Sequence, residues 1–381
     1  MTQPVVAHSV NPFLFGTGSW VYGQLKSLAR YRALIVCKRR ENRETFPFEA
    51  VYAREELSQL DQLGQRLARR LNGGFYPFMR DAIRSNEARV LHSHFASQGW
   101  SDLALARATK LPHVTSFYGA DIWKNTQSEA WRRRYRDLFA RGSLFLVEGN
   151  AMRVKVESLG CPAAKVVVQH LGVALDGTPL VERRIAADGV VRVLMSGRAV
   201  EKKGFEFGVR AFALAAREMP SLRLSLMVIA KSKEELERVA RLHQLAESEH
   251  VAELVDFPPS RPYDEYRRAL LDYHVYLAPS LHASDGDAEG GAPVSVSEMS
   301  ASGMPIVASR HCDIPEVAPH SVSGLLFNEG DVEGCADSLL VMARNPAGWP
   351  AFGRAGRAHI EREYDVATQA RKLEALYDGL T

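Results

Sequence analysis

The chain has 381 residues, of which 46% are hydrophobic and 24% are charged. This composition is ordinary for a globular protein with a sizeable core and excludes disordered, collagen-like and disulfide-scaffold proteins. The length fits two domains best. The net charge of +3 is uneven: residues 1–176 hold 25 Lys and Arg against 15 Asp and Glu, and the remainder holds 23 against 30. A basic half joined to an acidic half predicts two domains with different partners.

The N-terminal sequence and the cysteines predict a cytoplasmic protein. No apolar run approaches the ~18 residues that a membrane span needs. The sequence begins without the basic and then apolar segments of a secretory signal. The four cysteines are far apart in the sequence and form no CxxC pair or zinc-spaced cluster, so we expect reduced thiols.

Three basic clusters lie in the first half, at residues 38–40, 69–70 and 132–136. Such clusters can steer a protein toward a phosphorylated substrate or toward anionic lipid, and peripheral contact with the inner face of a membrane is one interpretation. A solvated helix face is the plain alternative. Nucleic acid is not expected as a partner, because no recognised nucleic-acid-binding motif accompanies the charge.

Short β-rich runs alternate with helical patterns along the chain. In the first half we expect strands at 34–37, 90–94, 113–117, 144–148 and 166–170, with helices such as 102–110 and 151–159 between them. In the second half we expect strands at 191–196, 222–229, 275–278, 304–308 and 324–327, separated by helices near 205–218, 233–247, 262–271, 294–302 and 331–343. An amphipathic helix at 366–380 follows.

This alternation predicts an α/β fold with two Rossmann-like, doubly wound parallel sheets that face each other across a cleft. The predicted domains are residues 1–176 and 190–363, joined by a linker at 177–189 and followed by a helical segment at 364–381. Because ligands bind beyond the carboxyl ends of the strands in open α/β sheets, the site is sought just after the strands.

A glycine-bearing loop is the first candidate along the chain. Gly16, Thr17 and Gly18 precede a helix, and backbone N–H groups at such a point can close over a phosphate or face a sugar. The spacing is not Gly-x-Gly-x-x-Gly, because position 21 is Val. We therefore expect a substrate contact here, and a simple dehydrogenase is disfavoured.

Polar residues follow two strands that are expected to be neighbours. His94 ends one strand, and Tyr118 and Asp121 follow the next. A single His at a strand end is more often a hydrogen-bonded structural residue. Three polar residues converging at one sheet edge favour a binding site instead.

A basic loop follows the strand at 191–196. Gly197 allows a sharp turn, after which Arg198 and Lys203 project near the start of a helix. A guanidinium fork, an ammonium group and free helix N–H groups form a diphosphate site that needs no metal. The alternative is a solvated loop that happens to be basic.

A second loop follows the strand at 275–278 and leads into a helix through Pro293. Gly290 and Gly291 let backbone N–H groups approach an anion, while Glu298 in the helix can accept hydrogen bonds from a ribose diol. Glu289 can bind sugar hydroxyls. A capped buried helix is the alternative reading. The pair Asp285 and Asp287 also fits a metal site, but the basic residues make a metal unnecessary for phosphate binding.

Taken together, these segments resemble the family 4 retaining glycosyltransferases of the GT-B architecture. Gly197-Arg198 to Lys203-Gly204 matches the family's Gly-Arg-x-x-x-x-Lys-Gly, and EGGAPVSVSEMSASGMPIVAS at 289–309 is similar to its two-Glu signature. The likeness is greatest to enzymes of bacterial exopolysaccharide and related glycan assembly. The chain departs from the family pattern in two places. Eight residues rather than seven separate Glu289 from Glu298, so strict spacing places Gly290 at the first Glu position. Tyr118 stands where the family often has His.

The resemblance implies a retaining, metal-independent transferase that moves a sugar from a nucleotide-diphosphate sugar to a glycan, lipid-linked or small-molecule hydroxyl. The first domain would bind the acceptor, the second would bind the donor, and the C-terminal helix would return to the first. The implied catalytic residues are Arg198, Lys203 and Glu289. The implied donor-binding residues are Gly197, Gly290, Gly291, Ala292, Pro293 and Glu298, and the implied acceptor-side residues are Gly16, Thr17, Gly18, His94, Tyr118 and Asp121.

No cofactor or metal is expected, and family frequency favours a UDP-sugar donor. Two alternatives stay open. The departures at Tyr118 and Glu289 are compatible with a catalytically inactive subunit that only binds a nucleotide sugar. A nucleotide-sugar epimerase is another enzyme on the same fold, whereas a glycan phosphorylase would carry a pyridoxal cofactor for which the sequence gives no basis.

Overall fold

The computed structural model describes residues 3–14, 18–72, 74–259 and 263–381. The chain divides into two compact units, which are described separately. Unit 1 comprises Met1–Gly172 and Val366–Thr381, and unit 2 comprises Val173–Asp365.

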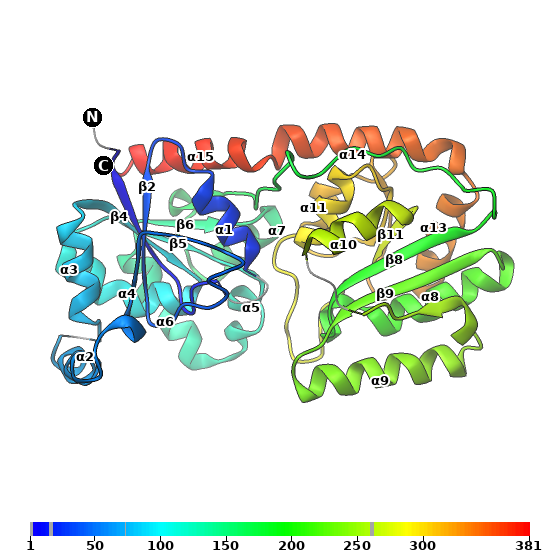
Figure 1. Ribbon diagram of the computed structural model, residues 1–381. Coiled ribbons are helices and arrows are strands. Elements are labelled where there is room, and N and C mark those ends of the chain that lie inside the picture. Colours follow the sequence, from blue (N-terminus) through cyan, green and yellow to red (C-terminus); the bar gives the residue numbers. More distant parts are fainter. Residues whose placement is uncertain (1–2, 15–17, 73, 260–262) are drawn as a thin grey trace. The chain divides into compact units, whose positions relative to one another are not determined.

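Unit 1 is built on a seven-stranded parallel sheet (Figure 1) with the strand order β3-β2-β1-β4-β5-β6-β7. The order reverses at β1, as in a doubly wound sheet. The strands are β1 (Val5–Ser9), β2 (Arg32–Cys37), β3 (Val51–Ala53), β4 (Ala88–His94), β5 (His113–Ser116), β6 (Leu144–Val147) and β7 (Val166–Val168).

Helices cover both faces of this sheet, because successive side chains of a buried strand point to opposite faces. In β1, Val5 and Ala7 pack with Met79 and Leu105 of two helices on one face. Val6 packs on the other face with the C-terminal helix. The helices of unit 1 are α1 (Ser19–Lys26), α2 (Gln59–Leu71), α3 (Pro77–Ser85), α4 (Ala96–Thr109), α5 (Gly119–Ile122), α6 (Glu129–Arg141), α7 (Asn150–Ser158) and α15 (Val366–Asp378).

The C-terminal helix α15 completes the core of unit 1. The buried carboxylate of Glu374 accepts hydrogen bonds from the backbone N–H groups of Ala29, Arg30 and Tyr31, at 2.7, 2.6 and 3.2 Å. The hydroxyl of Tyr377 is 2.7 Å from Nδ1 of His92. The last helix therefore supplies hydrogen-bond partners to backbone and side-chain groups that lie much earlier in the sequence.

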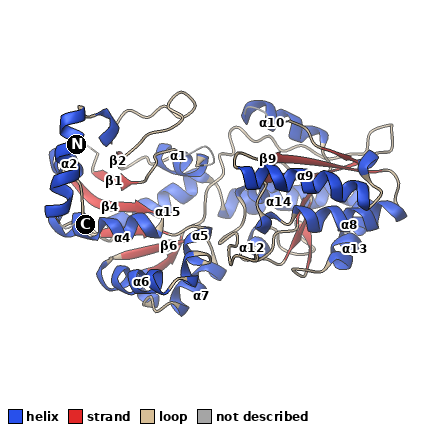
Figure 2. Ribbon diagram, turned by 90° about the horizontal axis from the view of Figure 1, so that it is seen from below, coloured by secondary structure: helices blue, strands red, loops and turns tan. Residues whose placement is uncertain are grey.

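Unit 2 is built on a six-stranded parallel sheet (Figure 2) with the order β10-β9-β8-β11-β12-β13. Met195 of β8 packs toward α8 and α13, whereas Leu194 packs toward α11 and α14. The strands are β8 (Val191–Arg198), β9 (Leu222–Ile229), β10 (Val255–Asp256), β11 (Val275–Ala278), β12 (Ile306–Ser309) and β13 (Gly324–Phe327). The helices are α8 (Phe205–Glu218), α9 (Lys233–Ser248), α10 (Tyr263–Ala269), α11 (Val294–Ala301), α12 (Ile314–Val317), α13 (Val332–Ala343) and α14 (Trp349–Glu363).

The predicted fold class of two doubly wound parallel sheets is confirmed. Three strands (β1, β3 and β10) and, in unit 2, helices α12 and α14 were not expected from the sequence. The apolar run of β1 is short, and its last two residues, His8 and Ser9, are polar although both are buried. Among the described residues, no helix combines the length and the apolar character that crossing a bilayer requires.

Candidate functional site

The carboxyl end of β8 carries the basic segment of unit 2. The strand continues through Gly197 and Arg198, which pair with Val228 and Ile229 of β9. Gly197 has φ 148°, a conformation that side chains rarely adopt. It is therefore a glycine position by backbone geometry, and it sets the direction in which Arg198 leaves the sheet.

Arg198 is held by a residue that the sequence analysis missed. Its guanidinium donates from Nε and Nη2 to Oε1 of Glu235, at 3.1 and 2.5 Å. Glu235 is buried at the start of α9, where it also accepts the backbone N–H of Ser232 in a capping box. The Ser-x-x-Glu spacing from Ser232 to Glu235 indicates the start of this helix, but it does not indicate that Glu235 pairs with Arg198.

Lys203 and Glu289 lie together, although they are 86 positions apart in the sequence. The Lys203 Nζ is 3.0 Å from Oε1 and 3.1 Å from Oε2 of Glu289. Both side chains are mostly buried. A buried ion pair is stabilising only if further hydrogen bonds satisfy its lone pairs, and here the Ser280 hydroxyl donates to Oε1 at 2.9 Å.

Glu289 is ionised at neutral pH. Burial by itself raises its pKa, but the ammonium groups of Lys203 and Lys202 outweigh burial and hold that pKa below the usual value. The Glu289 backbone N–H donates to Nε2 of His311, whose Nδ1 is 2.8 Å from a carboxylate oxygen of Glu329. An ionised carboxylate here is a hydrogen-bond acceptor, for example for a sugar hydroxyl, and not a proton donor.

His311 and Glu329 were also missed, although one signal was available. His311 lies two residues after the end of β12, and applying the carboxyl-end rule to that strand would have selected it. Glu329 follows β13 in the same way.

The loop before α11 brings the remaining predicted donor-binding residues to the same sheet edge. Gly290 and Gly291 are buried, as is Pro293, which caps the helix, and Ala292 and Glu298 are partly buried. The buried hydroxyl of Tyr276 on β11 donates to the Ser295 hydroxyl at 2.8 Å and so fixes the first turn of α11. A small cavity of about 10 Å³ lies here, and Ser196, Lys203, Ser280 and Pro293 are among its lining residues.

Gly204 explains why the basic segment turns sharply into α8. Its φ is +64°, and a Cβ atom there would lie 1.9 Å from the carbonyl oxygen of Pro279. Any side chain at this position would push β11 and the start of α8 apart. Gly204 therefore fixes the position of Lys203 relative to β11.

Asp285 and Asp287, the alternative metal pair, are engaged within the protein. The Asp287 carboxylate lies 3.3 Å from Lys202 Nζ, which also donates to the Ala288 carbonyl at 2.9 Å. An Asp285 oxygen accepts the backbone N–H of Asp287. Elsewhere in the described chain, two groups have possible ligand atoms within 4.8 Å of one another: His8, His92 and His94, and His282, His311 and Cys312.

The predicted acceptor-side residues of unit 1 form a buried network. Nδ1 of His94 is 2.8 Å from the Tyr118 hydroxyl. Asp121 accepts the backbone N–H groups of Ala96 and Tyr118, at 3.0 and 3.3 Å. The structure thus brings His94, Tyr118 and Asp121 together, and all three are buried.

Burial keeps His94 and Tyr118 uncharged over a wide pH range. It lowers the pKa of His94 to about 3 and raises the pKa of Tyr118 above its ordinary value. Burial also raises the pKa of Asp121 to about 7. Gly16 and Thr17 lie outside the described residues, and Gly18 caps the N-terminus of α1.

Two family models match the chain. Residues 16–176 match Glycosyltransferase Family 4, and residues 191–345 match Glycosyl transferases group 1. The amylovoran biosynthesis glycosyltransferase AmsK of Erwinia amylovora is 30% identical over 291 residues, covering 76% of this chain and 70% of that protein. The colanic acid biosynthesis glycosyltransferase WcaL of Escherichia coli is 29% identical over 301 residues, covering 77% and 71%.

Solved structures share the fold at low sequence identity. The Anabaena protein HepE, in complex with UDP and glucose, has a TM-score of 0.77 and 17% identity, covering 99% of this chain and 100% of that chain. The apo galactosyltransferase WaaB of the lipopolysaccharide outer core has a TM-score of 0.71 and 10% identity, covering all of both chains. The chain belongs to the family 4 retaining glycosyltransferases of the GT-B fold, enzymes that transfer sugar from a nucleotide sugar.

Proposed function

We propose that the chain transfers a sugar from a UDP-sugar to a hydroxyl of a glycan or lipid-linked acceptor, in the assembly of a bacterial exopolysaccharide. Unit 2 binds the donor and unit 1 the acceptor. The names of AmsK and WcaL support the kind of product. A solved complex of HepE with UDP-glucose supports the choice of a UDP-sugar as the donor. The reaction takes place in the cytoplasm, where nucleotide sugars are available.

The buried Lys203–Glu289 ion pair carries the proposal. Lys203 is a cation held at the carboxyl end of the sheet, and Arg198 is a second one that stays about half exposed. Both stabilise the negative charge that develops on the diphosphate as the anomeric bond breaks. Gly197, Gly290, Gly291, Ala292 and Pro293 let the backbone approach the donor, and Glu298 accepts from its ribose.

Glu289 has two tasks in this proposal. As an ionised group it holds the Lys203 ammonium in place, and it accepts a hydrogen bond from a hydroxyl of the transferred sugar. The acceptor proton goes to the departing diphosphate oxygen. The uncharged state of His94 and Tyr118 supports this assignment, because neither is tuned to exchange a proton near pH 7.

A thermal-shift series with UDP, GDP, ADP and dTDP, with and without EDTA, tests the donor. A ligand at 100 times its Kd stabilises the folded state by about 2.7 kcal/mol. We expect UDP to raise the melting temperature, EDTA to leave the rise unchanged, and Lys203→Met to abolish it. Lys202→Met is the matched control and should keep it, because Lys202 is bonded to Asp287 and the Ala288 carbonyl.

Three results would contradict the proposal. A rise with GDP and not UDP overturns the donor base, and a rise that EDTA removes overturns the metal-free site. A Lys203→Met variant that keeps the full rise with UDP shows that the diphosphate binds elsewhere.

A further inference from the structure

Helix α2 turns Gln65 and Arg69 toward the rest of unit 1 and its leucines away from it. Gln65 accepts the backbone N–H of Phe78 at 3.0 Å, and Arg69 donates to the Gly74 carbonyl at 2.6 Å. None of the residues of α2 is buried. Its four leucines expose much of their surface: Leu60 83%, Leu63 55%, Leu67 56% and Leu71 87%.

The leucines form one continuous stripe. At 3.6 residues per turn they fall within about 80° of the helix circumference, and Gln65 and Arg69 lie on the opposite side. Gly64 borders the stripe, and a Cβ atom there would meet nothing within 4 Å. An apolar face normally packs against the protein, whereas in the structure of this chain it is the outer face.

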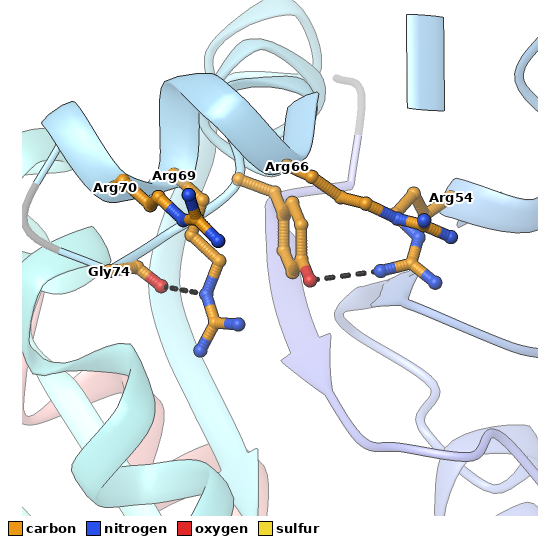
Figure 3. A pocket seen from close by; sticks show the side chains of 6 residues that line it. Arg54, Arg66, Arg69, Arg70 and Gly74 are labelled. Carbon is orange, nitrogen blue, oxygen red and sulfur yellow. Dashed lines mark hydrogen bonds between the residues drawn. The ribbon is translucent and has the colours of Figure 1, made fainter. Parts of the chain in front are cut away.

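Arginines lie on one flank of the stripe and behind it. On the circumference of the helix, Arg66 and Arg70 lie next to the leucines, both on the same side of the stripe. With Arg54, Arg69 and Tyr76 they line a pocket of about 440 Å³ (Figure 3). Arg54 and Arg69 are stacked over the Tyr76 ring, 5.3 and 5.1 Å from its centroid, and Arg54 donates to its hydroxyl at 2.9 Å.

We propose that α2 docks the protein on an anionic phospholipid surface. The leucine stripe enters the boundary between head groups and acyl chains, and the arginines bind lipid phosphates. A helix with a strong apolar face and basic flanking residues is the type that lies in a membrane interface. Guanidinium groups suit phosphate because their fork can bind two of its oxygens at once.

Charge complementarity decides the occupant of the stripe. A second copy of the chain, pairing its own α2 antiparallel on the stripe by two-fold symmetry, would place both sets of arginines on the same flank, where they repel each other. A phosphate-rich lipid surface meets the arginines and the leucines at once. The proposal rests on α2 and not on the identity of the sugar donor.

Vesicle co-sedimentation of the full chain tests the proposal. We expect binding to vesicles that mix phosphatidylglycerol with phosphatidylcholine, and little binding to phosphatidylcholine alone. Arg66→Gln with Arg70→Gln should weaken binding about 30-fold, from the loss of two charges near the surface. Leu63→Gln with Leu67→Gln should weaken it at least about tenfold.

The chain offers matched controls on α9 in unit 2. Leu236 has a similar exposure of 58%, and Arg241 is also exposed. Leu236→Gln and Arg241→Gln should bind as the unchanged chain does. Because all of the substituted side chains are exposed, melting temperatures should stay the same, which excludes unfolding as the cause of a loss.

The proposal is overturned if the unchanged chain binds neither kind of vesicle or binds both equally. It is also overturned if Leu63→Gln with Leu67→Gln binds like the unchanged chain. If the unchanged chain is a dimer by light scattering and this variant is a monomer, a second copy covers the stripe instead.

Discussion

The carboxyl ends of the two sheets carry polar residues in contrasting electrostatic states. In unit 2, Lys203 and Glu289 are both ionised partners within a charged group. In unit 1, His94 and Tyr118 are buried and uncharged, joined by a hydrogen bond. The same position in the same kind of sheet thus holds an ion pair in one unit and a hydrogen bond between two uncharged side chains in the other. In the proposed function, the charged group of unit 2 stabilises the departing diphosphate, and unit 1 binds the acceptor.

The largest expected difference between the two units is how much folding stability each loses at low pH. Burial lowers the pKa of four histidines in unit 1, namely His8, His92, His94 and His113. The unfolded chain binds protons at these positions below pH ~6.5, where the folded chain does not, so stability is lost as the pH falls. Asp121 opposes this, because its pKa of about 7 lets the folded state bind a proton first.

We expect unit 1 to lose about 3 kcal/mol per pH unit between pH 6 and 5, from the four histidines less the carboxyl contribution. Unit 2 has fewer such imidazoles among its described residues, namely His274 and His311. Its paired carboxylates Glu235 and Glu289 have lowered pKa values, so their contribution is lost only below pH ~4.5. Hydrogen exchange by mass spectrometry at stepped pH should show unit 1 opening first. Earlier opening of unit 2 would refute this difference.

Lys203→Met should affect both rate and stability. We expect kcat to fall about 100-fold, the usual size of effect when one transition-state charge partner is lost. We also expect the free energy of unfolding to fall by about 3 kcal/mol, because Glu289 stays buried without its cation. Adding Glu289→Gln should restore most of the stability and none of the rate. Urea denaturation and a transfer assay measure the two. Recovery of rate in the double variant would mean that Lys203 acts only through folding.

Arg198→Gln should affect rate alone. Arg198 is about half exposed, so its ion pair adds less than about 1 kcal/mol. Glu235 keeps the backbone N–H groups of Lys231 and Ser232 as donors. We expect about a 100-fold loss of kcat with an unchanged midpoint in urea. Arg241→Gln, which changes an exposed arginine on α9, is the control and should alter neither. A normal rate in Arg198→Gln would remove Arg198 from the diphosphate site.

Tyr118→Phe should have the smallest effect, and should affect stability rather than rate. It removes the hydrogen bond to His94 and the hydroxyl's hydrogen-bonding contacts with Ser116 and Trp20, and should cost about 1–3 kcal/mol in urea denaturation. We expect kcat to change less than about threefold. A tenfold fall in kcat with unchanged stability would instead place the Tyr118 hydroxyl on the acceptor.

Much of the fold was predictable, because strand runs and helical periods alternate clearly along most of the chain. The sequence also predicted that Lys203 and Glu289 lie at one edge, since each follows a strand and the carboxyl ends of parallel strands meet at the same edge. It did not predict that Arg198 pairs with Glu235, because that contact depends on how α9 packs. Nor did it predict the outward stripe of α2, since leucine spacing shows that a face is apolar and not what covers it.

The return of α15 to unit 1 has a consequence for how the protein is made. A ribosome completes residues 1–172 well before it reaches Glu374 and Tyr377. Until then the N–H groups of Ala29, Arg30 and Tyr31 lack their carboxylate and His92 lacks its phenol. Unit 2 is one continuous segment of the chain, so its folding does not depend on residues synthesised after it. The half that is synthesised first is therefore expected to finish folding last, and chaperones should bind nascent chains through unit 1.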